Sequence, residues 1–211
     1  MSFIGILLAL LAERGLGHIP GWGEPALFPA LVSRLPRWLP LDWLWRSYAA
    51  PFALVLPPVL LVWFLRGELS NSFAELLFSS VILLLCLGPR DLADDVQRLL
   101  RAHEAEDAQA VSQLSRALMR GPEPEPTQRT LLGALFIQSH ERLFGVLVWF
   151  FVLGPAGAVL YRIASRLPRI LRETQPQLAG TPALVAAEAL HGLLAWLPAR
   201  LTALIYGLAG S

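Results

Sequence analysis

The residues most able to do chemistry gather in one short polar cluster, Gln138-Ser139-His140-Glu141-Arg142, directly before the most apolar stretch of the chain. Ionisable groups at membrane depth are costly to bury, so they mark either a functional site or a paired structural network. A carboxylate, an imidazole and a guanidinium together can bind polar groups and move a proton. The same side chains can equally lie at a membrane interface and pair with charges on neighbouring helices. The residues alone leave both interpretations open.

Four further residues are candidates to join this cluster from other parts of the chain. Two of them follow a short apolar start, and the other two lie in the apolar C-terminal region. The predicted polar site therefore draws on seven residues: Glu13, Arg14, His140, Glu141, Arg142, His191 and Arg200. Within this set we expect Glu141 to pair with Arg200, because an isolated buried carboxylate is strongly destabilising.

The familiar signatures of catalytic and cofactor sites are absent from the sequence. It contains no GxxxxGK[ST] phosphate loop, no GxGxxG after a strand, no HExxH and no GxSxG. The four histidines are scattered without the spacing of metal ligands. A single cysteine, Cys86, excludes an intrachain disulfide and a thiolate metal cluster. The residues therefore predict no bound metal and no cofactor.

The composition indicates what kind of protein must position these residues. Hydrophobic residues make up 55% of the 211 residues and charged ones only 16%, with a mean hydropathy of +0.54. Soluble domains carry roughly a quarter charged residues. A net charge of +1 offers no basic surface for nucleic acid. We therefore predict an all-α integral membrane bundle, with about three to five membrane-embedded helices, whose first partner is the lipid bilayer.

Three apolar runs are long enough, or nearly so, to cross a bilayer: residues 48–65, 73–88 and 143–161. Glu75 lies near the entry of the second run, where the positive end of a helix dipole favours a carboxylate. Gly154-Pro155 interrupts the third run and predicts a break or bend. The short apolar start, 3–12, is predicted to be a partly embedded helix. The C-terminal stretch 183–209 is predicted to be amphipathic or pocket-lining rather than lipid-facing.

Residues 89–130 are the one substantial water-soluble segment in the sequence. Apolar residues recur at helical spacing in two stretches, one from Leu92 and one after Asp107. Three prolines in 121–126, GPEPEP, must end the second helix. We predict a short helical hairpin, inserted in a single membrane domain that covers 1–211, with a surface for a protein partner.

The distribution of arginine predicts which side of the membrane this hairpin faces. If the three long runs each cross once, segments 13–47 and 89–130 share a side that holds ten Arg, and the opposite side holds five. Because cytoplasmic segments carry an excess of basic residues, the hairpin is predicted to be cytoplasmic. Four of the five Arg on the lighter side cluster in 162–172, which weighs against this orientation.

Several stretches of the sequence resemble two related membrane-protein families. LFGVLVWFFVLGPAGAVLYRIASRL, residues 143–167, and LAWLPARLTAL, residues 194–204, resemble a pattern shared by the AmpE and CobD/CbiB families. Glu13-Arg14-Gly15-Leu16-Gly17 resembles the acidic-Arg-x-x-Gly opening of the same group, and 90–119 resembles the segment between its second and third apolar regions. Together these matches cover most of the chain.

The polar positions separate the two families. CobD-like enzymes carry an ENTSDG-like run where this sequence has Glu141-Arg142-Leu143-Phe144-Gly145, so only the Glu and the closing Gly persist. They also carry an acidic pair and an amide where this sequence has His191, Gly192 and Ala195. An enzyme that joins an amine to a large corrinoid acid needs polar groups to polarise the reacting carboxyl. The resemblance therefore favours AmpE, which implies a multi-pass inner-membrane protein, signalling or scaffolding rather than catalytic, linked to β-lactamase regulation and cell-wall recycling.

The alternative is a membrane enzyme of the adenosylcobinamide-phosphate synthase type, CobD/CbiB, acting in cobalamin biosynthesis. Its site would lie under the bilayer surface near Glu13, Glu141 and Arg200. A homo-oligomer is compatible with both interpretations. AmpE-like chains run on to a further apolar segment, so the stop at Gly210-Ser211 predicts a truncated or shortened chain.

Overall fold

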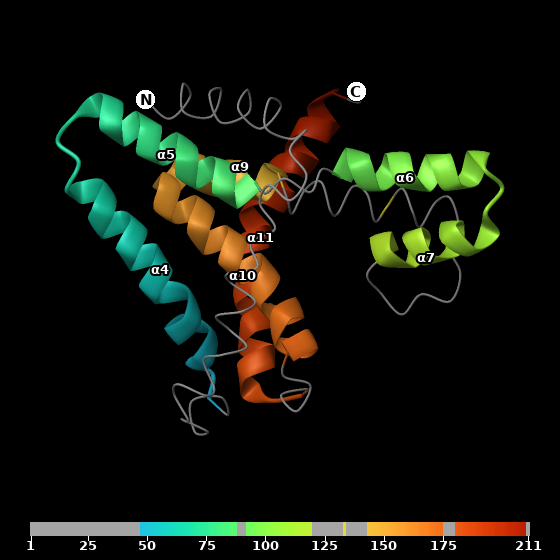
Figure 1. The fold of residues 1–211 in the computed structure, drawn as a ribbon. Coiled ribbons are helices and arrows are strands. Elements are labelled where there is room, and N and C mark those ends of the chain that lie inside the picture. Colours follow the sequence, from blue (N-terminus) through green and yellow to red (C-terminus); the bar gives the residue numbers. More distant parts are fainter. Residues whose placement is uncertain (1–46, 88–91, 120–132, 134–142, 175–179, 210–211) are drawn as a thin grey trace.

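The computed structural model describes residues 47–87, 92–119, 133, 143–174 and 180–209. Within them every regular element is a helix: α4 (Ala50–Gly67), α5 (Ser72–Leu87), α6 (Leu92–Glu104), α7 (Ala108–Met119), α9 (Gly145–Leu153), α10 (Pro155–Thr174) and α11 (Pro182–Ala209). Five of these helices form a bundle, while α6 and α7 pack on each other beside it (Figure 1). The predicted all-α class is confirmed.

The first two apolar runs form the helical pair α4 and α5. Helix α4 continues through Pro57 and Pro58, and the side-chain oxygen of Asn71 accepts a hydrogen bond from the Phe73 N–H, 2.9 Å, at the start of α5. Arg66 joins the two helices across their turn, because its Nε and Nη2 both donate to Glu75 Oε1, at 2.9 and 2.7 Å. The position of Glu75 thus reflects an ion pair as well as the helix dipole.

The third apolar run reverses direction at the predicted break. Gly154 has φ +68° and ψ −153° between α9 and α10, a backbone conformation that glycine adopts without a steric penalty. Gly157 lies so close to the backbone of Trp149 that a Cβ there would overlap the Trp149 carbonyl oxygen. The two helices therefore pack side by side in opposite directions. The break is confirmed, since α10 returns along α9, and how often this run crosses a membrane stays a prediction.

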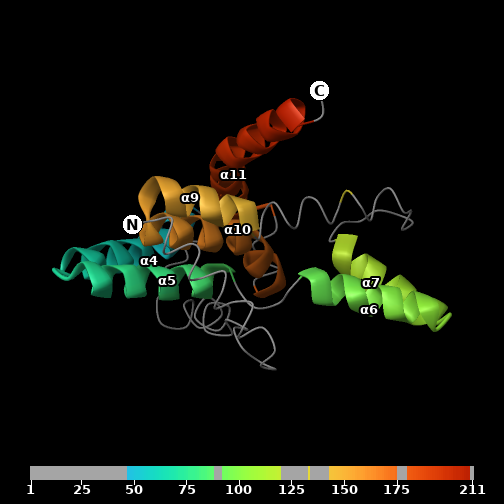
Figure 2. The same cartoon turned by 90° about the horizontal axis from the view of Figure 1, so that it is seen from above.

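Helix α10 is the central element of the bundle. It lies between α4 and α5 on one side and α11 on the other, with α9 along its first half (Figure 2). One buried cluster joins α4, α10 and α11: Ala50, Leu54, Val55, Ile163, Leu167, Ile170, Leu171, Ala183, Leu184 and Ala187. A second joins α5, α9, α10 and α11: Leu83, Cys86, Leu87, Val146, Phe150, Ala158, Tyr161, Ala164 and Leu194. Both clusters contain residues of α10, so this helix fixes the positions of α4, α5, α9 and α11.

The C-terminal stretch is one continuous helix with an apolar outer surface. Helices α4 and α11 are both long and apolar enough to cross a membrane. The outward side chains of α11 include Leu193, Trp196, Leu204 and Leu208, which are 72, 59, 63 and 80% exposed. These exposed apolar side chains do not fit the predicted amphipathic pattern, and whether this stretch faces lipid stays a prediction.

The exposed apolar surface of the bundle predicts a requirement for lipid or detergent. Large apolar side chains also stand exposed along α4, α5 and α9, well beyond the few hundred Å² of contiguous apolar surface typical of soluble monomers. We expect the chain to aggregate when extracted without detergent and to give a single particle in a mild detergent. Size-exclusion chromatography of both preparations checks this, and a monodisperse particle from a detergent-free soluble fraction would contradict it.

The polar hairpin has the two helices expected from the sequence. Glu106, with φ +55°, turns the chain between α6 and α7. Asp107 begins α7, because its Oδ1 accepts hydrogen bonds from the N–H groups of Gln109 and Ala110 at 3.1 and 2.9 Å, as expected of an N-cap residue. The helical hairpin is therefore present, and its cytoplasmic location stays a prediction.

Candidate functional site

Two of the seven predicted site residues, His191 and Arg200, lie in the part of the chain that the structure describes. The other five lie outside the described residues: Glu13, Arg14, His140, Glu141 and Arg142. The proposed pairing of Glu141 with Arg200 therefore stays a prediction. His191 is the predicted site residue that lies inside the described bundle, between α10 and α11.

His191 lies against Tyr161 at the contact between α11 and α10. The two rings meet edge to face, with centroids 6.4 Å apart and an interplanar angle of 63°. Tyr161 is fully buried, and both its hydroxyl oxygen and the Nε2 of His191 are buried atoms. Two groups that can donate and accept hydrogen bonds are thus placed next to each other inside the bundle.

Tyr161 also closes on Gly145 at the first turn of α9. A Cβ at Gly145 would overlap the Cζ and hydroxyl of Tyr161, so only glycine leaves room for the ring. Gly145 closes the Glu141–Gly145 segment, and His191 lies just upstream of the WLPARLTAL segment. Tyr161 therefore lies between Gly145, which closes the first of the two stretches that separate the families, and His191 in the second.

A second contact fixes α9 to α11 on the same side of the bundle. The indole Nε1 of Trp149 donates a hydrogen bond to the carbonyl oxygen of Leu194, at 2.9 Å. Leu194 is three residues beyond His191 and shares its side of α11. The indole therefore helps to hold the His191 side of α11 against α9.

Arg200 is not brought to the same place as His191. The two residues are nine positions apart on α11, which at 3.6 residues per turn puts them on opposite sides of the helix. The guanidinium of Arg200 lies over the ring of Trp196, 5.4 Å from its centroid, a cation–π contact. Within the single chain, the structure therefore does not place His191 and Arg200 at one site.

Glu188, the acidic residue nearest to His191 in α11, has a separate role. Its Oε1 accepts a hydrogen bond from Nη2 of Arg172, which joins the end of α10 to α11. Both side chains are well exposed, 60% for Arg172 and 44% for Glu188. The pair therefore contributes little to stability, and it is separate from the contact between His191 and Tyr161.

The chemistry open to this arrangement is proton transfer and orientation of a polar group. An imidazole can act as a general base or acid, and a buried tyrosine beside it restricts the orientation of its ring. In the described part of the chain no three His, Cys, Asp or Glu side chains lie close enough to hold a metal ion. Sequence reasoning missed Tyr161, although a lone Tyr preceding Arg in an apolar helix is a visible signal for a buried polar group.

The fold and the site define a membrane-associated helical bundle with a buried Tyr–His pair between its central and last helices. A family model described as "CobD/Cbib protein" matches residues 6–211, and the chain belongs to this CobD/CbiB family. It is similar to the cobalamin biosynthesis protein CobD of Chromobacterium violaceum, with 30% identity over 99% of this chain and 70% of that protein. The CobD of Stutzerimonas stutzeri gives the same identity and the same coverage. No solved structure matches the chain.

These comparisons overturn the AmpE interpretation. The resemblance to AmpE rested on two segments in which polar residues typical of CobD-like enzymes are replaced. The family match nevertheless runs along almost the whole chain, and both curated relatives are CobD proteins. A few substituted polar positions were therefore given too much weight against the pattern of the whole bundle. A role in signalling or β-lactamase regulation is not supported.

Proposed function

We propose that this chain is a membrane-embedded protein of cobalamin biosynthesis that takes part in joining an amine to a carboxyl group of a corrinoid acid. The observation that carries the proposal is the similarity to CobD proteins over 99% of the chain. The membrane location draws support from the two apolar helices α4 and α11. We further propose that the protein crosses the bacterial cytoplasmic membrane several times.

The residues in the described bundle that best fit such a reaction are His191 and Tyr161. Forming the amide makes a C–N bond and breaks a carboxyl C–O bond, whose oxygen would leave as phosphate after activation by a nucleoside triphosphate as co-reactant. The attacking amine must lose a proton, so a group that accepts this proton near the reacting carboxyl accelerates the step. His191 can take this role because one edge of its ring is held by Tyr161 while the residue as a whole is only partly buried. Tyr161 is fully buried and is therefore a positioning residue.

Complementation tests this proposal. A Chromobacterium violaceum strain that lacks its own CobD is supplied with this chain, and cobalamin is measured in the cells. We expect production to be restored by the unchanged chain. His191→Ala and His191→Gln are both expected to lower production at least tenfold, because general acid–base groups typically contribute a factor of about 10²–10⁴.

Leu204→Ala is the matched control for the histidine variants. Leu204 lies on the same helix and is 63% exposed, so this variant should restore cobalamin as well as the unchanged chain does. Each variant is first confirmed in the membrane fraction by immunoblotting. If the unchanged chain reaches the membrane in normal amounts and restores no cobalamin, the proposed function is wrong.

A further inference from the structure

Helix α10 has one apolar side and one strongly basic side. Its apolar residues fill both buried clusters of the bundle. Its arginines fall at spacings of four, three and three residues, which align them along one side of a helix: Arg162, Arg166, Arg169 and Arg172. We call these four residues the arginine stripe. Arg162 and Arg166 are half-buried, and Arg169 and Arg172 are exposed.

The arginine stripe begins at the level where α5 ends. The Nη2 of Arg162 donates a hydrogen bond to the carbonyl oxygen of Leu87, the last residue of α5, at 3.1 Å. The thiol of Cys86 lies within electrostatic range of both Arg162 and Arg166. Because α10 returns along α9, the stripe lies at the end of α5 from which the chain leads to α6. The stripe therefore belongs to the same side of the molecule as the α6–α7 hairpin.

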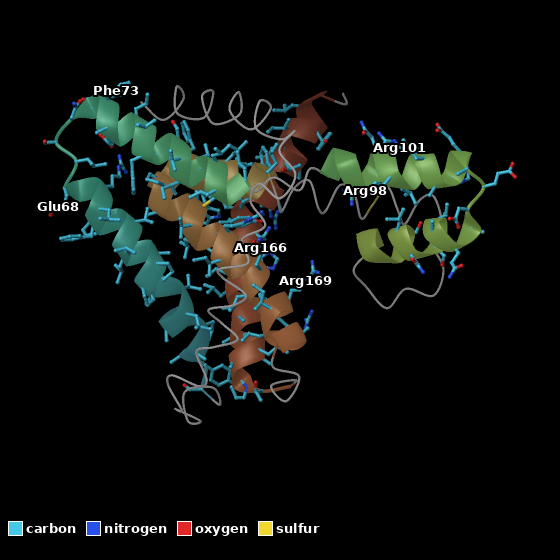
Figure 3. All side chains as sticks on the ribbon, viewed as in Figure 1. Glu68, Phe73, Arg98, Arg101, Arg166 and Arg169 are labelled. Atoms are coloured by element: carbon cyan, nitrogen blue, oxygen red, sulfur yellow. The ribbon has the colours of Figure 1, made fainter. Side chains whose placement is uncertain are left out.

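The opposite end of the bundle carries the Arg66–Glu75 ion pair among exposed apolar side chains. These side chains come from the end of α4, the start of α5 and the end of α9: Leu60, Leu61, Trp63, Phe64, Leu65, Phe73, Leu77, Phe151, Val152 and Leu153. Figure 3 shows Phe73 and Glu68 at this end, far from Arg166 and Arg169, which project from α10 on the side of the hairpin. The two ends of the described bundle therefore differ in charge, because the arginine stripe lies away from the turn between α4 and α5.

The reversal between α9 and α10 also changes the position of the four arginines in 162–172, which weighed against the predicted orientation of the hairpin. With α10 returning along α9, the arginine stripe lies at the end of the described bundle where α5 ends, whereas Arg66 lies at the turn between α4 and α5. This distribution agrees with the excess of basic residues on cytoplasmic segments. The stripe is then placed at the inner surface of the membrane, where acidic phospholipids present phosphate groups.

We propose that the arginine stripe binds the phosphate headgroups of acidic phospholipids on the side of the membrane that the α6–α7 hairpin faces. Guanidinium groups match phosphate oxygens with two parallel hydrogen bonds. The long side chains of half-buried Arg can reach the interface from apolar surroundings. Charge complementarity favours phosphatidylglycerol over a zwitterionic lipid, and the continuous apolar surface of α4 and α5 receives the acyl chains.

The test is a lipid titration of the full chain in a neutral detergent. Short-chain phosphatidylglycerol or phosphatidylcholine of equal chain length is added, and the melting temperature is followed at low salt. We expect phosphatidylglycerol to raise the melting temperature and phosphatidylcholine to leave it unchanged. In Arg166→Gln/Arg169→Gln the apparent affinity for phosphatidylglycerol should fall about thirtyfold, since each basic residue near an anionic surface contributes a factor of roughly five.

Arg98→Gln/Arg101→Gln on α6 is the matched control, because it removes two Arg from a helix outside the bundle (Figure 3). This control should keep the full affinity. A loss of affinity in the control equal to that in the stripe variant would overturn the proposal, as would equal stabilisation by inorganic phosphate, which would mean a site for free phosphate. If the stripe variant melts too low to titrate, native mass spectrometry of retained phosphatidylglycerol gives the same comparison. These readouts measure lipid binding, so they are independent of cobalamin production.

Discussion

Replacing Gly157 with valine is expected to lower the melting temperature of the detergent-solubilised protein by about 10 °C. A side chain at this position would overlap the carbonyl oxygen of Trp149 and come within 2.7 Å of the Cβ of Leu153. Neither neighbour can move away, because the first is backbone and the second is held in the last turn of α9. Overpacking costs about 1–3 kcal/mol, and an overlap with backbone belongs at the upper end. Each kcal/mol corresponds to roughly 2–4 °C in a chain of this size.

Gly192→Ala provides a control with the opposite expected sign. Gly192 is exposed in the middle of α11, and a Cβ there meets nothing within 4 Å. Alanine in an exposed helix interior is more stable than glycine by roughly 0.5–1 kcal/mol. The two variants are compared by melting in the same detergent. Equal melting temperatures for Gly157→Val and the unchanged chain would show that α9 and α10 are not packed as described.

Replacing Tyr161 with alanine is expected to be as damaging, for a different reason. The ring belongs to α10 and is fully buried. It contacts Gly145 on α9 and His191 on α11. Removing a buried aromatic ring leaves a cavity and costs about 3–5 kcal/mol. Tyr161→Phe keeps the ring and removes only the hydroxyl, so it should cost at most about 1 kcal/mol. Melting of both variants in detergent separates the contribution of the ring from that of the hydroxyl.

A double-mutant cycle with Gly145 checks that the ring is where the structure places it. Gly145→Ala should destabilise the unchanged chain, because its Cβ would overlap Tyr161. In a Tyr161→Ala background the same substitution should cost much less, since the overlapping ring is gone. Additive losses would mean that Gly145 and Tyr161 are not in contact. The pair would then no longer connect the Glu141–Gly145 segment with His191.

The sequence by itself determined the class of protein and the positions of its main helices. Composition predicted an all-α membrane bundle, and the apolar runs 48–65 and 73–88 appear as α4 and α5 within a few residues. The break at Gly154-Pro155 and the hairpin around Asp107 were also predicted. These features are local, because helix length, proline position and an N-cap side chain are set by neighbouring residues.

Only the tertiary structure decided which way the chain turns and which side chains meet. Gly154 in the sequence predicts a break. Whether α10 then runs in the same direction as α9 or antiparallel to it depends on how Gly157 packs against Trp149, eight residues away. In the same way, Tyr161 looks like one more residue of an apolar run until α9 and α11 close on it. His191 and Arg200 were grouped because both are polar in an apolar stretch, yet the helical repeat puts them on opposite sides of α11. Contacts of this kind depend on packing between distant segments, which the residue pattern of any single segment does not contain.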